Sequence, residues 1–311
     1  MSSLLADYKG APWLVCTENG PADFTKAIIP EFQKALKDNP MLPGAEIEIN
    51  PSETPPGVKL DVYGSEGSLL YLYQSEGSAS QNGAGKLIFY VHGGGFITGA
   101  GKYVKGNAIL LHKIFGLPVA AEDYRLAPEH RWPAGLDDVY EAWNFAANEL
   151  GYKEKDIIVA GESAGGNLAL ALMHRIKAKG GNLPSHLILI SPSVDLTLEQ
   201  ESQTANQSLD IIFPSGVAPV IPLYADADNL RNVEVSPYFG DFSSMPPMYF
   251  AAGDAEVFLS DTLAAASKAQ ASGTIVKAHI FHGLWHAFPL MTPMIPESKT
   301  VFAEIQEFIS D

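Results

Sequence analysis

The chain has 311 residues, 46% of them hydrophobic, and its 36 Asp and Glu against 20 Lys and Arg give a formal net charge of −16. The length suits one large α/β domain with an added element, or two small domains, and the apolar fraction is typical of a globular core. The negative charge disfavours binding to nucleic-acid phosphates and to anionic membranes. We therefore expect a soluble globular protein with neither a nucleic-acid nor a membrane partner.

The first residues, Met1-Ser-Ser-Leu, show neither the basic region nor the long apolar run of a signal peptide. The apolar runs elsewhere are far shorter than the roughly 18 to 20 residues that span a bilayer. The single cysteine, Cys16, cannot form an intrachain disulfide. We expect a cytoplasmic protein in which Cys16 is a small packing residue and not a reactive thiol.

The first 86 residues are irregular in pattern. Apolar residues at helical spacing predict a helix over 21–38, which Pro30 is expected to kink or split. Strand-like runs follow at 46–50, 58–63 and 68–74, and a Gly-Ser-Glu-Gly loop between the last two predicts a hairpin. Residues 75–86 are rich in Gly and Ser, which predicts an exposed loop.

From residue 87 onward, apolar runs alternate with amphipathic segments. We expect strands at 87–91, 118–121, 157–160, 186–190, 247–251 and 276–281, and helices near 103–115, 134–150, 164–179, 259–272 and 297–309. This alternation predicts βαβ units and an α/β fold whose mainly parallel sheet is covered by helices on both faces. Residues 192–245 break the rhythm with prolines and acidic residues, so we expect an insertion that lies over the sheet edge.

A G-x-S-x-G pattern, Gly161-Glu-Ser-Ala-Gly165, lies between an expected strand and an expected helix. Strand, sharp turn and helix together are typical of a nucleophile elbow. The flanking glycines fit a strained turn with close backbone approach, and a helix N-terminus favours developing negative charge. The pattern indicates Ser163 as a nucleophile; the alternative is a structural turn with an ordinary serine.

Three successive glycines follow His92 at the end of the strand expected at 87–91. Backbone N–H groups without neighbouring side chains are what an oxyanion hole requires. The spacing does not match the phosphate-binding patterns G-x-x-x-x-G-K-[ST] or G-x-G-x-x-G. The alternatives are a flexible surface loop or a phosphate-binding turn.

His286 is the preferred candidate base, because it lies just beyond the last expected strand and the chain order nucleophile, acid, base suits such enzymes. His282, four residues earlier, is the alternative. The sequence holds neither an H-E-x-x-H motif nor a Cys/His cluster, so we expect no metal. We also expect no cofactor.

Four motifs occur in the order found in one family: His92-Gly-Gly-Gly-Phe96, Tyr124-Arg-Leu-Ala-Pro-Glu-His130, Gly161-Glu-Ser-Ala-Gly165 and Gly283-x-x-His286. From about residue 85 to the C-terminus the chain resembles esterases of the hormone-sensitive-lipase family, which have the α/β-hydrolase fold. The resemblance implies that Ser163 is the nucleophile and His286 the base. It also implies an oxyanion hole of N–H groups from Gly94, Gly95 and Ala164, with His92 supporting the glycine loop.

The same resemblance implies structural roles for a group of charged residues: Arg125, Glu129, Asp137 and Asp138. It further implies a cap, formed by residues 1–45 and by residues 192–230 inserted into a catalytic domain of 46–311. Related esterases often pair through the strand that corresponds to 276–281. If this strand lies at an open sheet edge, we expect a homodimer.

The triad acid is expected after the strand at 247–251, where Asp254 and Glu256 compete. The family places its acid two residues before an apolar residue and four or five before another carboxylate. Glu256 fits this pattern with Phe258 and Asp261 and resembles the family members that use Glu, so Asp254 is the second choice. Asp261 is expected to cap the helix that follows or to place a negative charge at its start.

The expected activity is hydrolysis of short- to medium-chain acyl esters by a serine carboxylesterase through an acyl-enzyme. One alternative is the same triad acting on amides, as an amidase or deacetylase. Another is a non-catalytic receptor for a small ligand, like the plant gibberellin receptors that resemble this family. Those receptors have lost the catalytic histidine, whereas His286 is present here.

Overall fold

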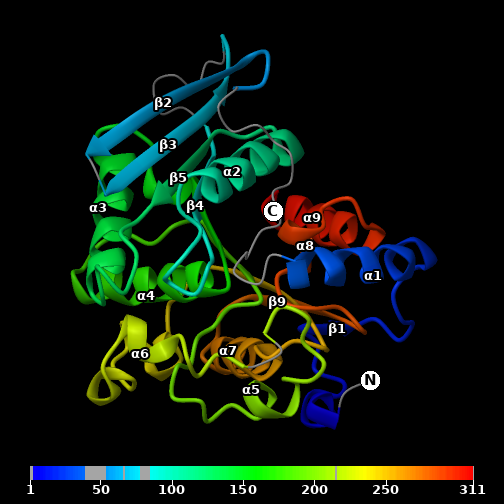
Figure 1. Cartoon of the computed structure of the whole chain (residues 1–311). Helices are drawn as coiled ribbons and strands as arrows, with labels where there is room; N and C mark the ends of the chain where they lie inside the picture. The colour runs from blue at the N-terminus through cyan, green and yellow to red at the C-terminus, as the bar shows by residue number, and fades with distance from the viewer. Residues whose placement is uncertain (1–2, 39–53, 66, 78–84, 214–215, 311) are drawn as a thin grey trace.

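The computed structural model describes residues 3–38, 54–65, 67–77, 85–213 and 216–310 (Figure 1). Its strands are β1 (Leu14–Cys16), β2 (Val58–Ser65), β3 (Ser68–Ser75), β4 (Leu87–Val91), β5 (Val119–Asp123), β6 (Ile157–Glu162), β7 (His186–Ile190), β8 (Met248–Gly253) and β9 (Val276–Phe281). The α-helices are α1 (Asp23–Asp38), α2 (Lys102–Phe115), α3 (Ala134–Asn148), α4 (Ala164–Ala178), α5 (Ser202–Ala205), α6 (Ile221–Tyr224), α7 (Leu259–Ala271), α8 (Phe288–Met291) and α9 (Pro296–Phe308). Short 3-10 helices are η1 (Ser3–Tyr8), η3 (Glu154–Asp156), η4 (Ala227–Asn229) and η5 (Pro237–Phe239).

These strands form one sheet in the order β1-β9-β8-β7-β6-β4-β5-β3-β2. Neighbours from β1 to β5 in this order are parallel, whereas β3 pairs antiparallel with both β5 and β2. The predicted α/β fold with a mainly parallel sheet is confirmed, and so is the hairpin formed by β2 and β3. The strand expected at 46–50 lies outside the described residues.

Strand β4 illustrates why both faces of the sheet are covered. Leu87, Phe89 and Val91 pack in one hydrophobic cluster with residues of α3, α4 and α7. Ile88 and Tyr90 point to the other face and pack with residues of α2 and α9. An uninterrupted apolar run predicts a strand buried on both faces, and β4 has no exposed residue.

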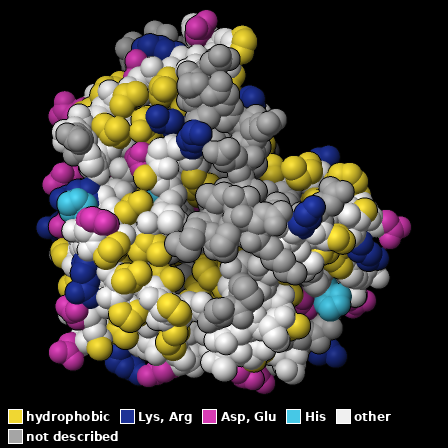
Figure 2. Space-filling view, in the orientation of Figure 1, with side chains coloured by type: hydrophobic (Ala, Val, Ile, Leu, Met, Phe, Trp, Pro, Cys, Tyr) yellow, Lys and Arg dark blue, Asp and Glu magenta, His cyan; other side chains and the backbone are white. Residues whose placement is uncertain are grey.

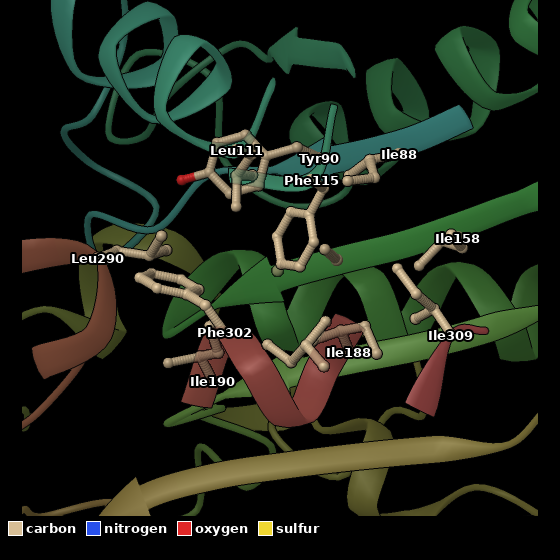
Figure 3. A pocket seen from close by; sticks show the side chains of 13 residues that line it. Ile88, Tyr90, Leu111, Phe115, Ile158, Ile188, Ile190, Leu290, Phe302 and Ile309 are labelled. Atoms are coloured by element: carbon tan, nitrogen blue, oxygen red, sulfur yellow. The ribbon is translucent and has the colours of Figure 1, made fainter. Parts of the chain in front are cut away.

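A small apolar cavity lies on the face of the sheet covered by α2 and α9 (Figure 3). Isoleucines of β4, β6 and β7 form its floor, and Phe115 and Phe302 from the two helices close its sides. The Tyr90 hydroxyl, at its edge, is already bonded to Glu162 and Asn107. The cavity is therefore a packing gap between two helices without free polar groups of its own.

Helix α1 runs through Pro30 without a break, so the expected split is wrong. Pro30 is exposed, and the Lys26 carbonyl that it leaves without a helical partner lies on the same solvent-facing side. Ile28 and Ile29, on the inner side, pack against the cluster that includes α9. The Glu297 carboxylate of α9 accepts the Ala22 N–H at 2.6 Å and so fixes the start of α1.

The open edge expected at strand 276–281 is wrong, because β1 pairs in parallel with β9 outside it. A run of three residues has too little pattern to be recognised as a strand in the sequence. η1 also packs on the core, where Leu5 contacts a cluster with Leu259 and Leu263 of α7. The edge argument for a homodimer therefore no longer applies, and β1 and η1 support the sheet rather than cover it.

Glu122 is a buried carboxylate in β5, 1% exposed, that accepts a hydrogen bond from the Ser68 hydroxyl at 2.8 Å. Its pKa is raised to about 8, chiefly by burial and also by the nearby Asp138, Asp123 and Glu141, against the lowering effect of the Ser68 hydrogen bond. The folded state therefore favours the protonated carboxyl. The contribution of Glu122 to the stability of the fold is complete below the unfolded-state pKa of about 4.3 and falls as the pH rises towards 8.

We predict that Glu122→Gln raises the melting temperature at pH 8.5 by about 3 °C or more and changes it little at pH 5. The amide keeps the shape of the protonated acid and cannot ionise. Thermal unfolding followed by circular dichroism at both pH values measures the difference. The exposed Glu129→Gln variant is the control; an equal or smaller gain at pH 8.5 than at pH 5 contradicts the prediction.

Candidate active site

Ser163 lies in the turn between β6 and α4. Its backbone has φ 55° and ψ −123°, a conformation that residues other than glycine rarely adopt. Gly161 and Gly165 permit this turn because neighbouring backbone atoms lie too close to them for a side chain to fit. A Cβ on Gly165 would lie 2.1 Å from the Val91 carbonyl oxygen, and one on Gly161 2.4 Å from the Gly165 oxygen. The turn presents the Ser163 side chain at the N-terminus of α4, as the sequence motif predicts.

The glycine loop after β4 is folded tightly beside this turn. Gly94 has φ 118° and Gly95 φ 62°, and the Gly94 carbonyl accepts the N–H groups of Ile97 and Thr98. Gly95 and Ala164 line the same pocket as Ser163. The structure thus brings two of the three expected oxyanion donors into the pocket, and Gly94 directly precedes one of them.

His92 is fully buried below the glycine loop. Its ring stacks on Tyr124 with centroids 4.2 Å apart, and its Nδ1 donates to the Gly93 carbonyl at 2.6 Å. Burial lowers the pKa of His92 to about 4, so the ring is neutral at physiological pH. These contacts suit a residue that supports the loop, which is the expected place for His92.

Glu162, which directly precedes the nucleophile, binds the glycine loop. Its Oε1 accepts the Gly93 N–H at 2.6 Å and the hydroxyls of Tyr90 and Tyr103 at 3.0 and 2.9 Å. Burial raises the pKa of Glu162 to about 7. The sequence motif contains Glu162 without assigning it a role; the signal for its role is its position beside the candidate nucleophile.

His286 and Glu256 lie side by side, 3% and 0% exposed in their side chains. His286 Nδ1 is 3.8 Å from Glu256 Oε1, and neither atom has a hydrogen-bond partner among the described residues. Phe213 and Phe258 pack edge-on against the imidazole with centroids 5.1 Å away. Both rings also line the pocket that contains Ser163.

Asp254 contacts the other candidate histidine. Its Oδ2 lies 2.7 Å from His282 Nδ1, and its Oδ1 accepts the Gly283 N–H at 2.7 Å. The His282 side chain is 36% exposed, unlike that of His286. The structure thus forms two carboxylate–histidine pairs, of which the pair of Glu256 and His286 packs against Phe213 and Phe258, two rings that line the Ser163 pocket.

Asp261 lies in the first turn of α7, which agrees with the expected charge at the helix start, but it does not cap the helix. The residue before the helix is Phe258, and the Asp261 carboxylate instead accepts the N–H groups of Val194 and Asp195 at 3.0 and 2.9 Å. Burial raises the pKa of Asp261 well above its ordinary value. It therefore ties the segment after β7 to α7.

The expected structural charges are split between two networks. Arg125 forms a bidentate contact with Asp138, at distances down to 2.6 Å. Asp137 instead pairs with Arg175 of α4, which also binds Glu234. Glu129 is exposed. The two arginines thus link α3 to the strand ends and to the 192–245 segment.

The pocket above Ser163 has an empty volume of about 370 Å³. Its walls are mostly apolar, and many of them come from the 192–245 segment: Ser193, Leu196, Phe213, Val217, Val220 and Ile221. Phe96, on the glycine loop, stacks on Tyr224 of α6 with centroids 3.7 Å apart. The segment therefore shapes the space next to the candidate nucleophile.

Two negative observations concern the described part of the chain. It contains no group of three or more His, Cys, Asp or Glu side chains placed to hold a metal ion. None of its helices is both long and apolar enough to cross a membrane. Figure 2 shows apolar, acidic and basic side chains mixed over one face of the molecule.

Comparison with known proteins adds independent findings. Residues 88–290 match the model of a protein family whose description is the alpha/beta hydrolase fold. The chain is 35% identical over 231 residues to an esterase of Acinetobacter venetianus, covering 74% of this chain and 76% of that protein. It is 31% identical over 248 residues to esterase LipU of Mycobacterium tuberculosis, covering 77% of this chain and 82% of that protein.

Solved structures of similar proteins superpose on this chain. The hormone-sensitive-lipase homologue EstE7 from a metagenome library superposes with a TM-score of 0.78 and 29% identity, covering 94% of this chain and 99% of that one. EstE5, in a crystal soaked with p-nitrophenyl butyrate, superposes with a TM-score of 0.77 and 26% identity, covering 90% of this chain and 96% of that one.

Proposed function

The chain belongs to the α/β-hydrolase superfamily and, within it, to the hormone-sensitive-lipase family; on this premise we propose that it is a serine carboxylesterase whose triad is Ser163, His286 and Glu256. The observation that carries the assignment is the pair of buried atoms, Glu256 Oε1 and His286 Nδ1, which face each other without another partner among the described residues. The His286 ring packs against Phe213 and Phe258, which line the Ser163 pocket. The esterase relatives support the reaction type.

In this mechanism the Ser163 hydroxyl attacks the ester carbonyl while His286 takes its proton. Glu256 accepts the Nδ1–H bond and stabilises the imidazolium that forms. The distance of 3.8 Å shortens when the charge develops, because catalytic hydrogen bonds tighten towards the transition state. The His286 proton then passes to the leaving alkoxide, and a water molecule hydrolyses the acyl-enzyme by the same route.

The tetrahedral oxyanion is stabilised by N–H groups of Gly94, Gly95 and Ala164. Losing one such donor typically costs roughly 3 to 4 kcal/mol of transition-state stabilisation. Glu162 keeps the loop in place through the Gly93 N–H. This chemistry needs neither a metal nor a cofactor, since the serine, the imidazole and water supply every group that is transferred.

The acyl group occupies the apolar pocket, and residues 192–230 form the cap over it. Leu196, Val217 and Val220 support this division, because these cap residues line the pocket. Within 1–45, we assign α1 to the cap among the described residues 3–38, since η1 and β1 pack on α7 and on the sheet. The apolar walls of this pocket and the resemblance to esterases that favour short acyl chains support a preference for acyl chains of about four to eight carbons.

We predict that Ser163→Ala lowers kcat on p-nitrophenyl butyrate at least about a thousandfold without lowering the melting temperature by more than about 2 °C. Only one small hydroxyl is removed, and within the described ranges that hydroxyl makes no hydrogen bond to the fold. Stopped assays on matched p-nitrophenyl esters and p-nitroanilides measure the loss. Residual activity above about 1% places the nucleophile elsewhere, and equal wild-type rates on anilides favour an amidase.

Glu256→Gln is expected to lower kcat by about 10⁴, whereas Asp254→Asn lowers it no more than about tenfold. Glu256 borders His286, and Asp254 is bonded to His282 and the Gly283 N–H. The two amide variants are matched, because each removes one charge at the same turn. The opposite ranking in steady-state kinetics assigns the triad acid to Asp254.

Among p-nitrophenyl esters, kcat/KM is expected to peak between butyrate and octanoate and to fall by about tenfold or more at palmitate. The walls contributed by Leu196, Val217 and Ile221 limit the depth of the pocket. Replacing Val217 with Ala enlarges it and is expected to move the peak to longer chains. A wild-type peak at palmitate contradicts the proposed substrate class.

A further inference from the structure

Ser191 directly follows β7 and is held in a rare backbone conformation. It is fully buried, its φ is 47°, and its N–H donates to the Ala251 carbonyl at 2.8 Å. A residue with a side chain adopts this conformation only where its surroundings enforce it. The direction of the Ser191 hydroxyl is therefore set by the sheet, between the end of β8 and the loop that carries His286.

The Ser191 hydroxyl contacts both sides of the proposed triad. It donates to Glu256 Oε2 at 2.7 Å and accepts the Ala287 N–H at 3.0 Å. Ala287 directly follows His286 in the chain. A hydroxyl has one donor and two acceptor positions, so both bonds form at the same time.

These bonds distinguish the two oxygens of Glu256. Oε2 accepts from Ser191 and from the Gly253 N–H at 3.0 Å. Oε1 has no hydrogen-bond partner within the described ranges and faces His286 Nδ1. Fixing Oε2 leaves Oε1 as the oxygen that is free to accept the imidazole N–H.

Other side chains around this turn hold its backbone and not its carboxylate. Asn206 donates to the carbonyls of Asp254 and Glu256, at 3.1 and 2.9 Å. Asp210 accepts the Val257 N–H at 2.9 Å and is the other buried carboxylate within electrostatic reach of His286. In the part of the chain that the structure describes, Ser191 is the side chain that donates to the Glu256 carboxylate.

We propose that Ser191 is a positioning residue of the triad, whose single hydroxyl aligns the Glu256 carboxylate with the loop that carries His286. The proposal rests on the function proposed above. It predicts an effect on the chemical step rather than on substrate binding, because Ser191 is absent from the residues that line the pocket.

The test is Ser191→Ala assayed with p-nitrophenyl butyrate. We expect kcat to fall about 10- to 100-fold, the effect of losing one hydrogen bond to a charged group, while KM changes less than about twofold. The acidic limb of the kcat/KM profile moves to lower pH, because the carboxylate that stabilises the His286 cation is no longer held against it. A role limited to stability leaves this limb in place.

Two further variants separate the hydroxyl from the backbone. Ser191→Gly also lacks the hydroxyl but relieves the left-handed conformation, so it is expected to fold at least as well as Ser191→Ala and to lose kcat to the same extent. Ser185→Ala removes a hydroxyl that bonds the Ile157 carbonyl at the opposite end of β7, far from the triad. It is expected to keep wild-type kcat and pH profile.

Each outcome decides the proposal. A folded Ser191→Gly variant with wild-type kcat and an unmoved acidic limb overturns it. Unfolding of both Ser191 variants, with Ser185→Ala intact, also overturns it, because the hydroxyl then serves stability. Ester hydrolysis that survives Ser163→Ala refutes the proposed function itself. Activity that depends on Ser163 but is unchanged in the Ser191 variants refutes the positioning role alone.

Discussion

The left-handed turn at Ser163 is the constraint on which the rest of the site depends. Gly161 and Gly165 leave no room for a Cβ, and the backbone of β4 lies directly against Gly165. The end of β4 and the start of α4 are therefore locked together, and the glycine loop emerges beside the nucleophile. The N–H of Ser163 bonds the Ile190 carbonyl, which adds β7 to the same rigid unit. Strain of this kind persists only where packing enforces it.

Buried carboxylates hold the loops around this unit. Glu162 binds the glycine loop, Glu256 the end of β8, and Asp261 the segment after β7. A buried carboxylate is costly unless donors surround it, so each of these acids stabilises the fold only while its backbone partners stay in place. The burial that raises the pKa of Glu162 to about 7 is the sign of this cost. The catalytic loops are thus linked to one another through charged groups.

The insertion after β7 is attached to the rest of the domain at several points. Tyr224 stacks on Phe96, and its carbonyl accepts the Trp132 N–H at 2.9 Å. Arg175 bridges Asp137 and Glu234. Asp210 of the insertion accepts the N–H of Val257 and so joins the insertion to the turn that carries Glu256. The wall of the proposed acyl pocket is therefore fixed relative to the proposed triad, so we expect its apolar residues to determine acyl length.

The sequence by itself determined the α/β alternation, the elbow at Ser163 and the glycine loop, because each is encoded by neighbouring residues whose spacing fixes the local backbone. It also singled out His286 by its motif and favoured Glu256 over Asp254. Only the tertiary structure decided which carboxylate faces which histidine, since residues two apart on one turn are oriented by distant partners such as Ser191 and His282. The same holds for β1, whose three residues become a strand only because β9 offers an edge to pair with. Contacts between segments far apart in the chain produce no regular residue spacing in the sequence, so they cannot be predicted from it. Those contacts decide the geometry of this site.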